Sequence, residues 1–207
     1  MNRNLLAHLL NIYVNIRAKL FTVIIVQIRE APMIATAENI ERRDFTLLLQ
    51  LGMGIDGFSS EWAYCDRLSS YMAKMVSHNR TDSLLYSNLL SSALNELLET
   101  VFRQHRAGGE FMCSIWRNGP YDRIELTIPS DETIDEFYQE VVSRLAQPDI
   151  GEQYHNALFR EGPLGADIGL MELAVDYAAS LSTYKINEQS TCLVAELAIE
   201  EAYPDVQ

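Results

Sequence analysis

Four polar residues in one short stretch of the chain could carry out chemistry on a phosphate. Glu96, Glu99, Thr100 and Arg103 belong to a long segment with the apolar spacing of a helix. Residues three or four apart share a helix face, so Glu96 lies above Thr100, while Glu99 and Arg103 form a second polar row. Carboxylates at a pocket can bind Mg²⁺ or position a nucleophile beside a phosphate. The same spacing is also typical of a solvated face with a Glu99–Arg103 ion pair.

A glycine-bearing loop that leads directly into a helix is the second candidate element. Residues 162–169 read GPLGADIG, and the following residues predict a helix over 170–181. The N–H groups at a helix start are unpaired and attract anions, so Gly165 and Gly169 could hold a phosphate. The alternative is a simple turn, in which the carboxylate of Asp167 caps the helix.

The order of these two elements resembles that of the histidine-kinase-like (GHKL) ATPases. Residues 93–101, ALNELLETV, are similar to the N-box helix of that family, and a strand pair and a glycine-bearing loop-helix follow in the family's order. Residues 169–178, GLMELAVDYA, resemble the matching stretch of the small stand-alone SiaB-type bacterial kinases and regulators. The resemblance spans about residues 45–200 and implies the family's fold, with ATP and Mg²⁺ as cofactors.

For function, the resemblance implies a cytoplasmic signalling protein. Members of the SiaB-type branch work with PP2C-type phosphatases and with small STAS-like or anti-sigma-antagonist-like proteins, which they phosphorylate on Ser or Thr. The resemblance implies that Glu96 is the catalytic residue that orients the attacking hydroxyl, and that Thr100 is a metal ligand. It places the nucleotide beside Glu99, Thr100, Arg103, Asp131, Gly165 and Gly169.

Three positions depart from the family pattern. Thr100 stands where the N-box has its Mg²⁺-binding asparagine, and Asp167 stands where the phosphate loop has a glycine. The segment 127–132 has no glycine where the adenine-reading Asp-x-Gly-x-Gly box is expected, so Asp131 only approximates that contact. These departures favour a regulator that binds a partner protein in a phosphorylation-controlled switch, with a degenerate ATP site. An active ATP-dependent Ser/Thr protein kinase is the alternative hypothesis, and a self-associating module is the third.

Composition limits the other possibilities. The chain has 207 residues, 48% of them hydrophobic, which is enough for one sizeable core. Its formal net charge of -13 excludes a surface that tracks nucleic-acid phosphates. The three cysteines form no CxxC pair and no even disulfide framework, so we expect buried thiols in a reducing compartment, at positions Cys65, Cys113 and Cys192.

The first 33 residues differ in composition from the rest. Residues 1–33 carry a formal net charge of +3 and the remaining residues carry -16, which together give the total of -13. Arg17 and Lys19 interrupt the apolar run, so the run does not predict a transmembrane helix. We expect an extension over 1–33 and one domain over 34–207. The extension has three interpretations: an amphipathic membrane-surface helix, a helix that docks on a partner or a homodimeric copy, or translated sequence upstream of a natural start at Met33.

The predicted elements define the fold class. Strands joined mainly as hairpins favour a mixed, mostly antiparallel sheet with helices on one face, which is a two-layer α/β sandwich. Asn118-Gly119 predicts a hairpin turn, and Ser130 is the expected cap of the helix that follows it. We predict strands over 45–51, 55–58, 110–116, 123–128, 183–187 and 191–199, and helices over 59–76, 82–106, 130–145, 150–160 and 170–181.

Overall fold

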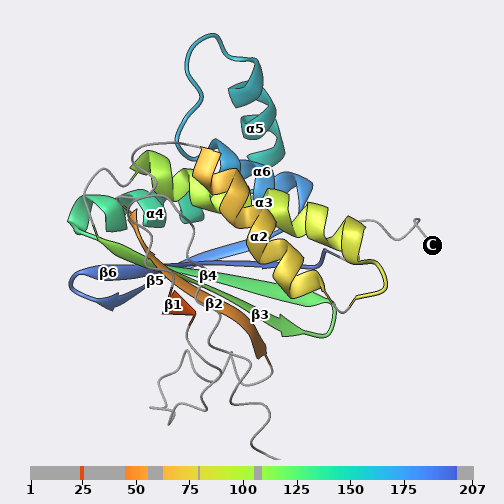
Figure 1. Cartoon of the computed structure of the whole chain (residues 1–207). Coiled ribbons are helices and arrows are strands. Elements are labelled where there is room, and N and C mark those ends of the chain that lie inside the picture. Colours follow the sequence, from red (N-terminus) through yellow and green to blue (C-terminus); the bar gives the residue numbers. More distant parts are fainter. Residues whose placement is uncertain (1–23, 26–44, 56–62, 79, 105–108, 200–207) are drawn as a thin grey trace, which may run out of the picture.

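The structure is a computed structural model, and it describes residues 24–25, 45–55, 63–78, 80–104 and 109–199. A sheet of strands forms one layer and helices form the other (Figure 1). The strand order is β1-β2-β3-β4-β6-β5, and each neighbouring pair runs antiparallel. The predicted two-layer α/β sandwich is confirmed, with antiparallel pairing throughout the described sheet.

The strands are close to their predicted positions. The hairpin around Gly119 joins β3 to β4, and Gly119 has the positive φ of 58° that the Asn-Gly signal predicts. A second hairpin joins β5 to β6. The bounds are β1 Ile24–Ile25, β2 Thr46–Gly54, β3 Glu110–Asn118, β4 Tyr121–Pro129, β5 Ser180–Asn187 and β6 Ser190–Leu197.

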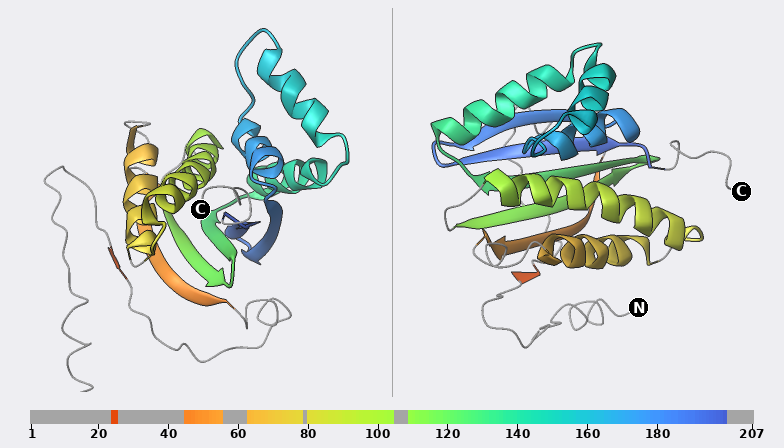
Figure 2. Two further views of the ribbon diagram at one scale, coloured as in Figure 1. Left: turned by 90° about the vertical axis from the view of Figure 1, so that its right-hand side faces the viewer. Right: turned by 90° about the horizontal axis from the view of Figure 1, so that it is seen from above.

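The described helices all lie on one side of the sheet (Figures 1 and 2). Helix α3 lies between α2 and α6 and contacts both. Helix α5 projects away from the helical layer and contacts α6, and none of its residues is buried. The bounds are α2 Ala63–Ser77, α3 Ser83–Gln104, α4 Glu132–Leu145, α5 Ile150–Phe159 and α6 Ile168–Asp176.

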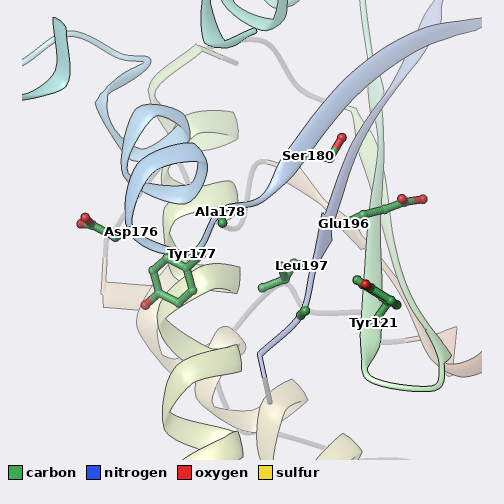
Figure 3. Close-up of a pocket in the computed structure, with 8 residues that line it drawn as sticks. Tyr121, Asp176, Tyr177, Ala178, Ser180, Glu196 and Leu197 are labelled. Carbon is green, nitrogen blue, oxygen red and sulfur yellow. The ribbon is translucent and has the colours of Figure 1, made fainter. Parts of the chain in front are cut away.

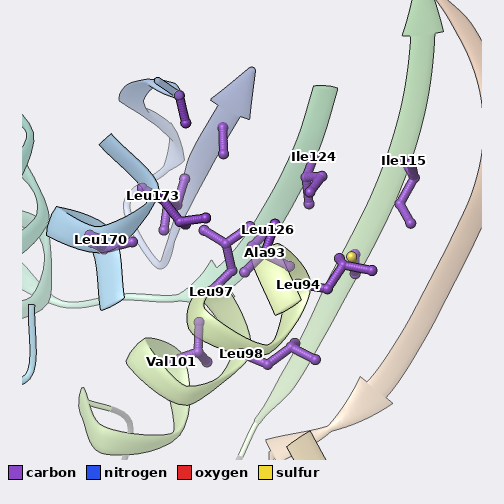
Figure 4. Packing of buried hydrophobic residues seen from close by; sticks show 14 of the residues in the cluster. Ala93, Leu94, Leu97, Leu98, Val101, Ile115, Ile124, Leu126, Leu170 and Leu173 are labelled. Carbon is purple, nitrogen blue, oxygen red and sulfur yellow. The ribbon is translucent and has the colours of Figure 1, made fainter. Parts of the chain in front are cut away.

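The apolar core fills the space between α3 and the middle of the sheet. The buried row of α3 packs over β3 and β4, whose side chains alternate between the two faces of the sheet (Figure 4). Helix α6 adds Leu170 and Leu173 to the same cluster. The α3 row comprises Ala93, Leu94, Leu97, Leu98 and Val101. None of the helices in the described ranges combines the length and apolar character that a bilayer span needs.

Two predicted helix boundaries are wrong. The helix expected over 170–181 ends at Asp176, and β5 begins at Ser180. Between them Ala178 adopts a φ of 48° and the Ala179 N–H donates to the carbonyl of Leu173, which stops the helix. At the other helix, Asp131 rather than Ser130 is the N-cap.

The three cysteines are buried and none forms a disulfide, as predicted. The expected strand over 55–58 and the start of the helix expected over 59–76 lie mostly outside the described residues. Of the extension over 1–33, the structure describes only β1, which pairs with Leu51 and Gly52 of β2.

Candidate functional site

Helix α3 carries Glu96, Glu99, Thr100 and Arg103, as the sequence predicts, but it uses them in different ways. Glu99 is only 6% exposed, and both of its carboxylate oxygens accept hydrogen bonds. Arg103 Nη2 donates to Oε2 at 2.9 Å, and Asn95 Nδ2 donates to Oε1 at 2.6 Å. The Glu99–Arg103 ion pair that the spacing indicates is therefore present. It neutralises Glu99 within its own helix.

Thr100 points into the protein. Its side chain is 1% exposed, and its hydroxyl donates to the backbone carbonyl of Glu96 at 2.9 Å. A hydroxyl that donates one turn back along its helix in a nearly inaccessible position is poorly placed to bind a metal ion. Among the described residues there is also no group of three or more His, Cys, Asp or Glu side chains that could hold a metal.

Glu96 lies at the contact between α3 and α6. It faces Gly169, where an added Cβ atom would lie 2.5 Å from Glu96 Oε2 and 3.2 Å from the Glu96 carbonyl oxygen. Gly169 therefore permits close packing of two helices, which is a sufficient physical reason for a glycine at this position. The two segments expected to form one site, α3 and the start of α6, do meet here.

The environment of Glu96 is strongly acidic. Burial, and then the negative charges of Glu172 and Glu99, raise the pKa of Glu96 to about 7, although Arg103 opposes this. Burial and Asp176 also raise the pKa of Glu172. A carboxyl group with a pKa near neutrality can accept or donate a proton under physiological conditions.

Helix α5 adds a tyrosine to this acidic group. The Tyr154 hydroxyl lies 3.5 Å from Asp176 Oδ2, and burial, Glu172 and Asp176 raise its pKa to about 12. Sequence reasoning missed Glu172, Asp176 and Tyr154 as neighbours of Glu96. The i,i+4 spacing of the two acids on α6 was a usable signal, but only the fold shows that they face α3 and α5. We call Glu96, Glu172, Asp176 and Tyr154 the acidic cluster.

The start of α6 is already occupied by hydrogen bonds. The Leu170 and Met171 N–H groups donate to the Asp167 carbonyl at 3.0 and 3.1 Å, and the Ile168 N–H donates to the Gly165 carbonyl at 3.3 Å. Ile168, Gly169 and Leu170 are buried, whereas Gly165 is exposed. These N–H groups are therefore not directed at an open phosphate site.

Asp167 does not cap the helix through its side chain. Its carboxylate forms an ion pair with Arg144 near the end of α4, and no capping hydrogen bond from that side chain is present. The alternative interpretation of the loop, in which Asp167 caps α6, is therefore wrong in detail. The acid holds the loop against α4 instead.

Asp131, the expected adenine contact, is the N-cap of α4. Its Oδ1 accepts a hydrogen bond from the Ile134 N–H at 2.9 Å. The neighbouring Ser130 N–H donates to the Gln189 carbonyl in the β5–β6 turn. Asp131 therefore lies where α4 meets the β5–β6 turn. Its carboxylate caps α4, which is a sufficient reason for an aspartate at this position.

A hollow of about 430 Å³ lies beyond the end of α6, next to the acidic cluster (Figure 3). The Asp176 and Glu196 carboxyl groups on its two sides point away from each other, so they do not converge on one ligand atom. Glu96, Gly165 and Gly169 do not line it. Its walls are formed by Tyr121, Asp176, Tyr177, Ala178, Ser180, Glu196, Leu197 and Ala198.

Comparisons of the chain with protein-family models, with curated proteins and with solved structures find no match. The functional interpretation consequently depends on the geometry of the residues themselves.

Proposed function

We propose that this protein is a bacterial signalling regulator that binds partner proteins in a phosphorylation-controlled switch, and that its ATP site is degenerate. The observation that carries the proposal is the contact between Glu96 and Gly169. Where a phosphate and its metal ion would have to lie, the two helices are in contact: a Cβ atom added to Gly169 would lie 2.5 Å from Glu96 Oε2 and 3.2 Å from the Glu96 carbonyl oxygen.

The surrounding groups support the same proposal. The Thr100 hydroxyl is buried and bonded to the Glu96 carbonyl, and Arg103 is paired with Glu99. Burial and then neighbouring carboxylates already raise the pKa values of Glu96 and Glu172, and a polyphosphate at this place would add more negative charge. Mg²⁺ would have to offset this repulsion without a set of ligands ready to bind it.

The proposed partners follow from the resemblance to the SiaB-type branch: a STAS-like or anti-sigma-antagonist-like protein, and a PP2C-type phosphatase. Regulation by binding needs no nucleotide turnover, so it is compatible with the closed contact between α3 and α6. The sequence features that weaken the expected ATP site and the geometry of that site favour the same class of protein.

One observation favours the alternative, an ATP-dependent Ser/Thr protein kinase. Glu96 has a pKa of about 7, which suits a general base. In that reaction Glu96 would take the proton of a Ser or Thr hydroxyl while the hydroxyl oxygen attacks the γ-phosphorus and ADP leaves. Helices α3 and α6 would have to separate to admit the nucleotide.

Calorimetric titration of the full chain with Mg-ATP distinguishes the regulator with a degenerate ATP site from the active kinase. We expect no binding heat up to about 1 mM nucleotide, which corresponds to a binding free energy weaker than about 4 kcal/mol. Binding in the wild type that disappears in Glu96→Gln, but persists in the control Glu152→Gln on α5, would support the kinase.

A second titration tests the partner directly. A candidate STAS-like partner is titrated into the regulator in its unmodified form and with its acceptor Ser or Thr changed to Glu. We expect binding of one form at least about tenfold tighter than the other, a difference of about 1.4 kcal/mol. Equal affinities, or no binding to either form, would contradict the switch.

A further inference from the structure

Helix α5 and the loop that follows it carry an exposed apolar surface. The helix projects away from the helical layer (Figure 1), and none of its residues is buried. The chain stays exposed through residues 158–165. Three residues of this stretch are large and apolar, with exposed fractions of 43%, 76% and 50%: Leu158, Phe159 and Leu164. We call residues 149–165 the α5 arm.

The two sides of α5 differ in what they contact. One side, spaced four and three residues apart along the helix, packs against the core beside α6. The residues of that side are Ile150, Tyr154 and Ala157. His155 and Phe159, also four residues apart, lie on another side, and their ring centroids are 4.6 Å apart. Packing of the first side holds the arm to the domain, whereas Phe159 stays largely open to water.

This exposure is more than the scatter of single apolar residues that every protein surface shows. Three large apolar side chains fall within seven residues of one projecting element. Burying the phenyl ring of Phe159 would be favourable, yet the described part of the chain leaves most of it uncovered. Exposed apolar groups gathered on one element are typical of a surface that binds another molecule.

The charges around the apolar side chains are mainly negative. The arm has four charged residues, all of them exposed: Asp149, Glu152, Arg160 and Glu161. The acidic cluster adds carboxylates at the base of the arm, where the Tyr154 hydroxyl lies 3.5 Å from Asp176 Oδ2. The whole chain carries a formal net charge of -13. The electrostatic field at the arm therefore attracts a cationic surface.

We infer that the α5 arm is the docking surface for a partner protein that offers a basic amphipathic segment, with apolar residues flanked by Lys and Arg. Charge separates this occupant from two others. A second copy of the chain would bring another net charge of -13, and an anionic membrane surface would also be repelled. A basic amphipathic segment gains both from apolar burial and from the opposite charge.

The arm lies outside the contact between Glu96 and Gly169, so the inference goes beyond the proposed function and requires no nucleotide. The probe is a helical peptide of leucine and lysine, about 14 residues long, whose apolar side is flanked by lysine. Its counterpart has glutamate in place of every lysine and keeps the same apolar side. Fluorescence anisotropy of each labelled peptide measures its dissociation constant with the full chain.

Two variants locate the binding. Phe159→Ser removes the largest apolar group of the arm, and Leu84→Ser removes an apolar side chain of the same exposed fraction, 76%, from α3. We expect the lysine peptide to bind Phe159→Ser about tenfold more weakly than wild type, because the phenyl ring is the anchor that binding buries. Leu84→Ser should bind like wild type. Urea denaturation should be unchanged in both variants, because both side chains are exposed.

The counterpart peptide tests the charge. We expect it to bind the wild type at least about tenfold more weakly than the lysine peptide. Equal affinities of the two peptides would overturn the proposed basic character of the partner. No binding of the lysine peptide to wild type, or equal affinities for Phe159→Ser and Leu84→Ser, would show that the arm is not the docking surface.

Two further outcomes would replace the proposed occupant. A mass in light scattering that doubles with concentration in wild type, but not in Phe159→Ser, would assign the arm to a second copy. Sedimentation with phosphatidylglycerol vesicles that is lost in Phe159→Ser would assign it to a membrane. The titrations that test the proposed function use Mg-ATP and a STAS-like protein, so the inference and the proposed function fail separately.

Discussion

Two buried or half-buried acidic sites, Asp122 on β4 and the acidic cluster around Glu96, differ in how their charge is balanced. At one end of the molecule, Asp122 is 1% exposed and accepts hydrogen bonds from the Tyr86 hydroxyl at 2.7 Å and from Arg117 Nε at 2.9 Å. Arg117 and Arg80 also lie over the Tyr86 ring. Burial raises the pKa of Asp122, and these hydrogen bonds oppose that rise.

The acidic cluster around Glu96 lacks this compensation. Its carboxyl groups repel one another, and Arg103, the guanidinium nearest to Glu96 on α3, is paired with Glu99. A fully bonded buried network holds a fold together, whereas a surplus of like charge costs stability. Asp122 therefore serves the structure, whereas the acidic cluster carries a charge that its neighbours do not balance.

The largest effect is expected at the balanced end. Asp122→Ala leaves the Arg117 guanidinium and the Tyr86 hydroxyl without their shared partner. We expect the free energy of unfolding to fall by about 3 to 5 kcal/mol in urea denaturation. The control Glu161→Ala, which removes an exposed loop carboxylate, should change it by less than about 0.5 kcal/mol. A loss below about 1 kcal/mol for Asp122→Ala would contradict the structural role.

Gly169→Ala tests the close approach of α3 and α6. The added methyl group would meet Glu96 Oε2 at 2.5 Å and its carbonyl oxygen at 3.2 Å, so we expect a loss of about 1 to 3 kcal/mol in urea denaturation. Gly151→Ala is the matched control, because nothing lies within 4 Å of the added atom on α5. That change should be neutral or stabilise the protein by up to about 1 kcal/mol.

The double variant Gly169→Ala with Glu96→Ala tests whether the Glu96 carboxylate causes the loss of stability. Removing the Glu96 carboxylate should recover part of the loss, because the nearest obstacle to the new methyl group disappears. Strict additivity of the two substitutions would show that the helices do not meet at this pair.

The substitution Glu96→Gln tests the unbalanced charge through the pH dependence of the free energy of unfolding. The pKa of folded Glu96 is about 7, above its ordinary value of 4.5, so the folded protein binds more protons than the unfolded chain between these values. Stability is therefore lost as pH rises from about 4.5 to about 7. We expect Glu96→Gln to be more stable than wild type by about 1 kcal/mol at pH 8, after allowance for solvent screening, and to show no such gain at pH 4.5.

Chemical denaturation at several pH values measures this difference. Glu152→Gln on α5 removes an exposed charge of the same type and serves as the control. A gain of the same size at both pH values would mean that ionisation of Glu96 is not the source of the instability.

The smallest effect is expected at the rim of the acidic cluster. Asp176→Asn should lower the Tyr154 pKa from about 12, because it removes one of the three carboxylates, Glu172, Asp176 and Glu96, that raise this pKa in addition to burial. Carbon-13 NMR titration of the tyrosine rings measures this shift. Glu188→Gln, in the β5–β6 turn, should leave the Tyr154 titration unchanged. An unchanged Tyr154 pKa in Asp176→Asn would remove Asp176 from the cluster.

The sequence predicts most of the fold because its local signals are strong. Asn118-Gly119 specifies the β3–β4 hairpin, and the apolar spacing of α3 marks its buried face. The end of α6 could not be predicted, since residues 177–179 contain no helix breaker, and the chain turns there through a left-handed Ala178. That turn is held by a backbone hydrogen bond to Leu173.

The candidate site was only partly predictable for the same reason. The Glu99–Arg103 pair follows from spacing within one helix. The approach of Gly169 to Glu96, and of Asp167 to Arg144, joins separate elements and depends on how the helices pack. Sequence alone could therefore identify the residues, but it could not show that packing and pairing already occupy most of them.

The strand order has a consequence for folding. Strand β6 inserts between β4 and β5, so the ion pair of Arg123 with Glu196 closes a loop of 73 residues that contains α4, α5 and α6. Such distant pairings form slowly, because the entropy of loop closure must be overcome first. The β3–β4 hairpin and the α2–α3 pair are local and can form earlier. We therefore expect the contact between Glu96 and Gly169 to be among the last parts of the molecule to assemble.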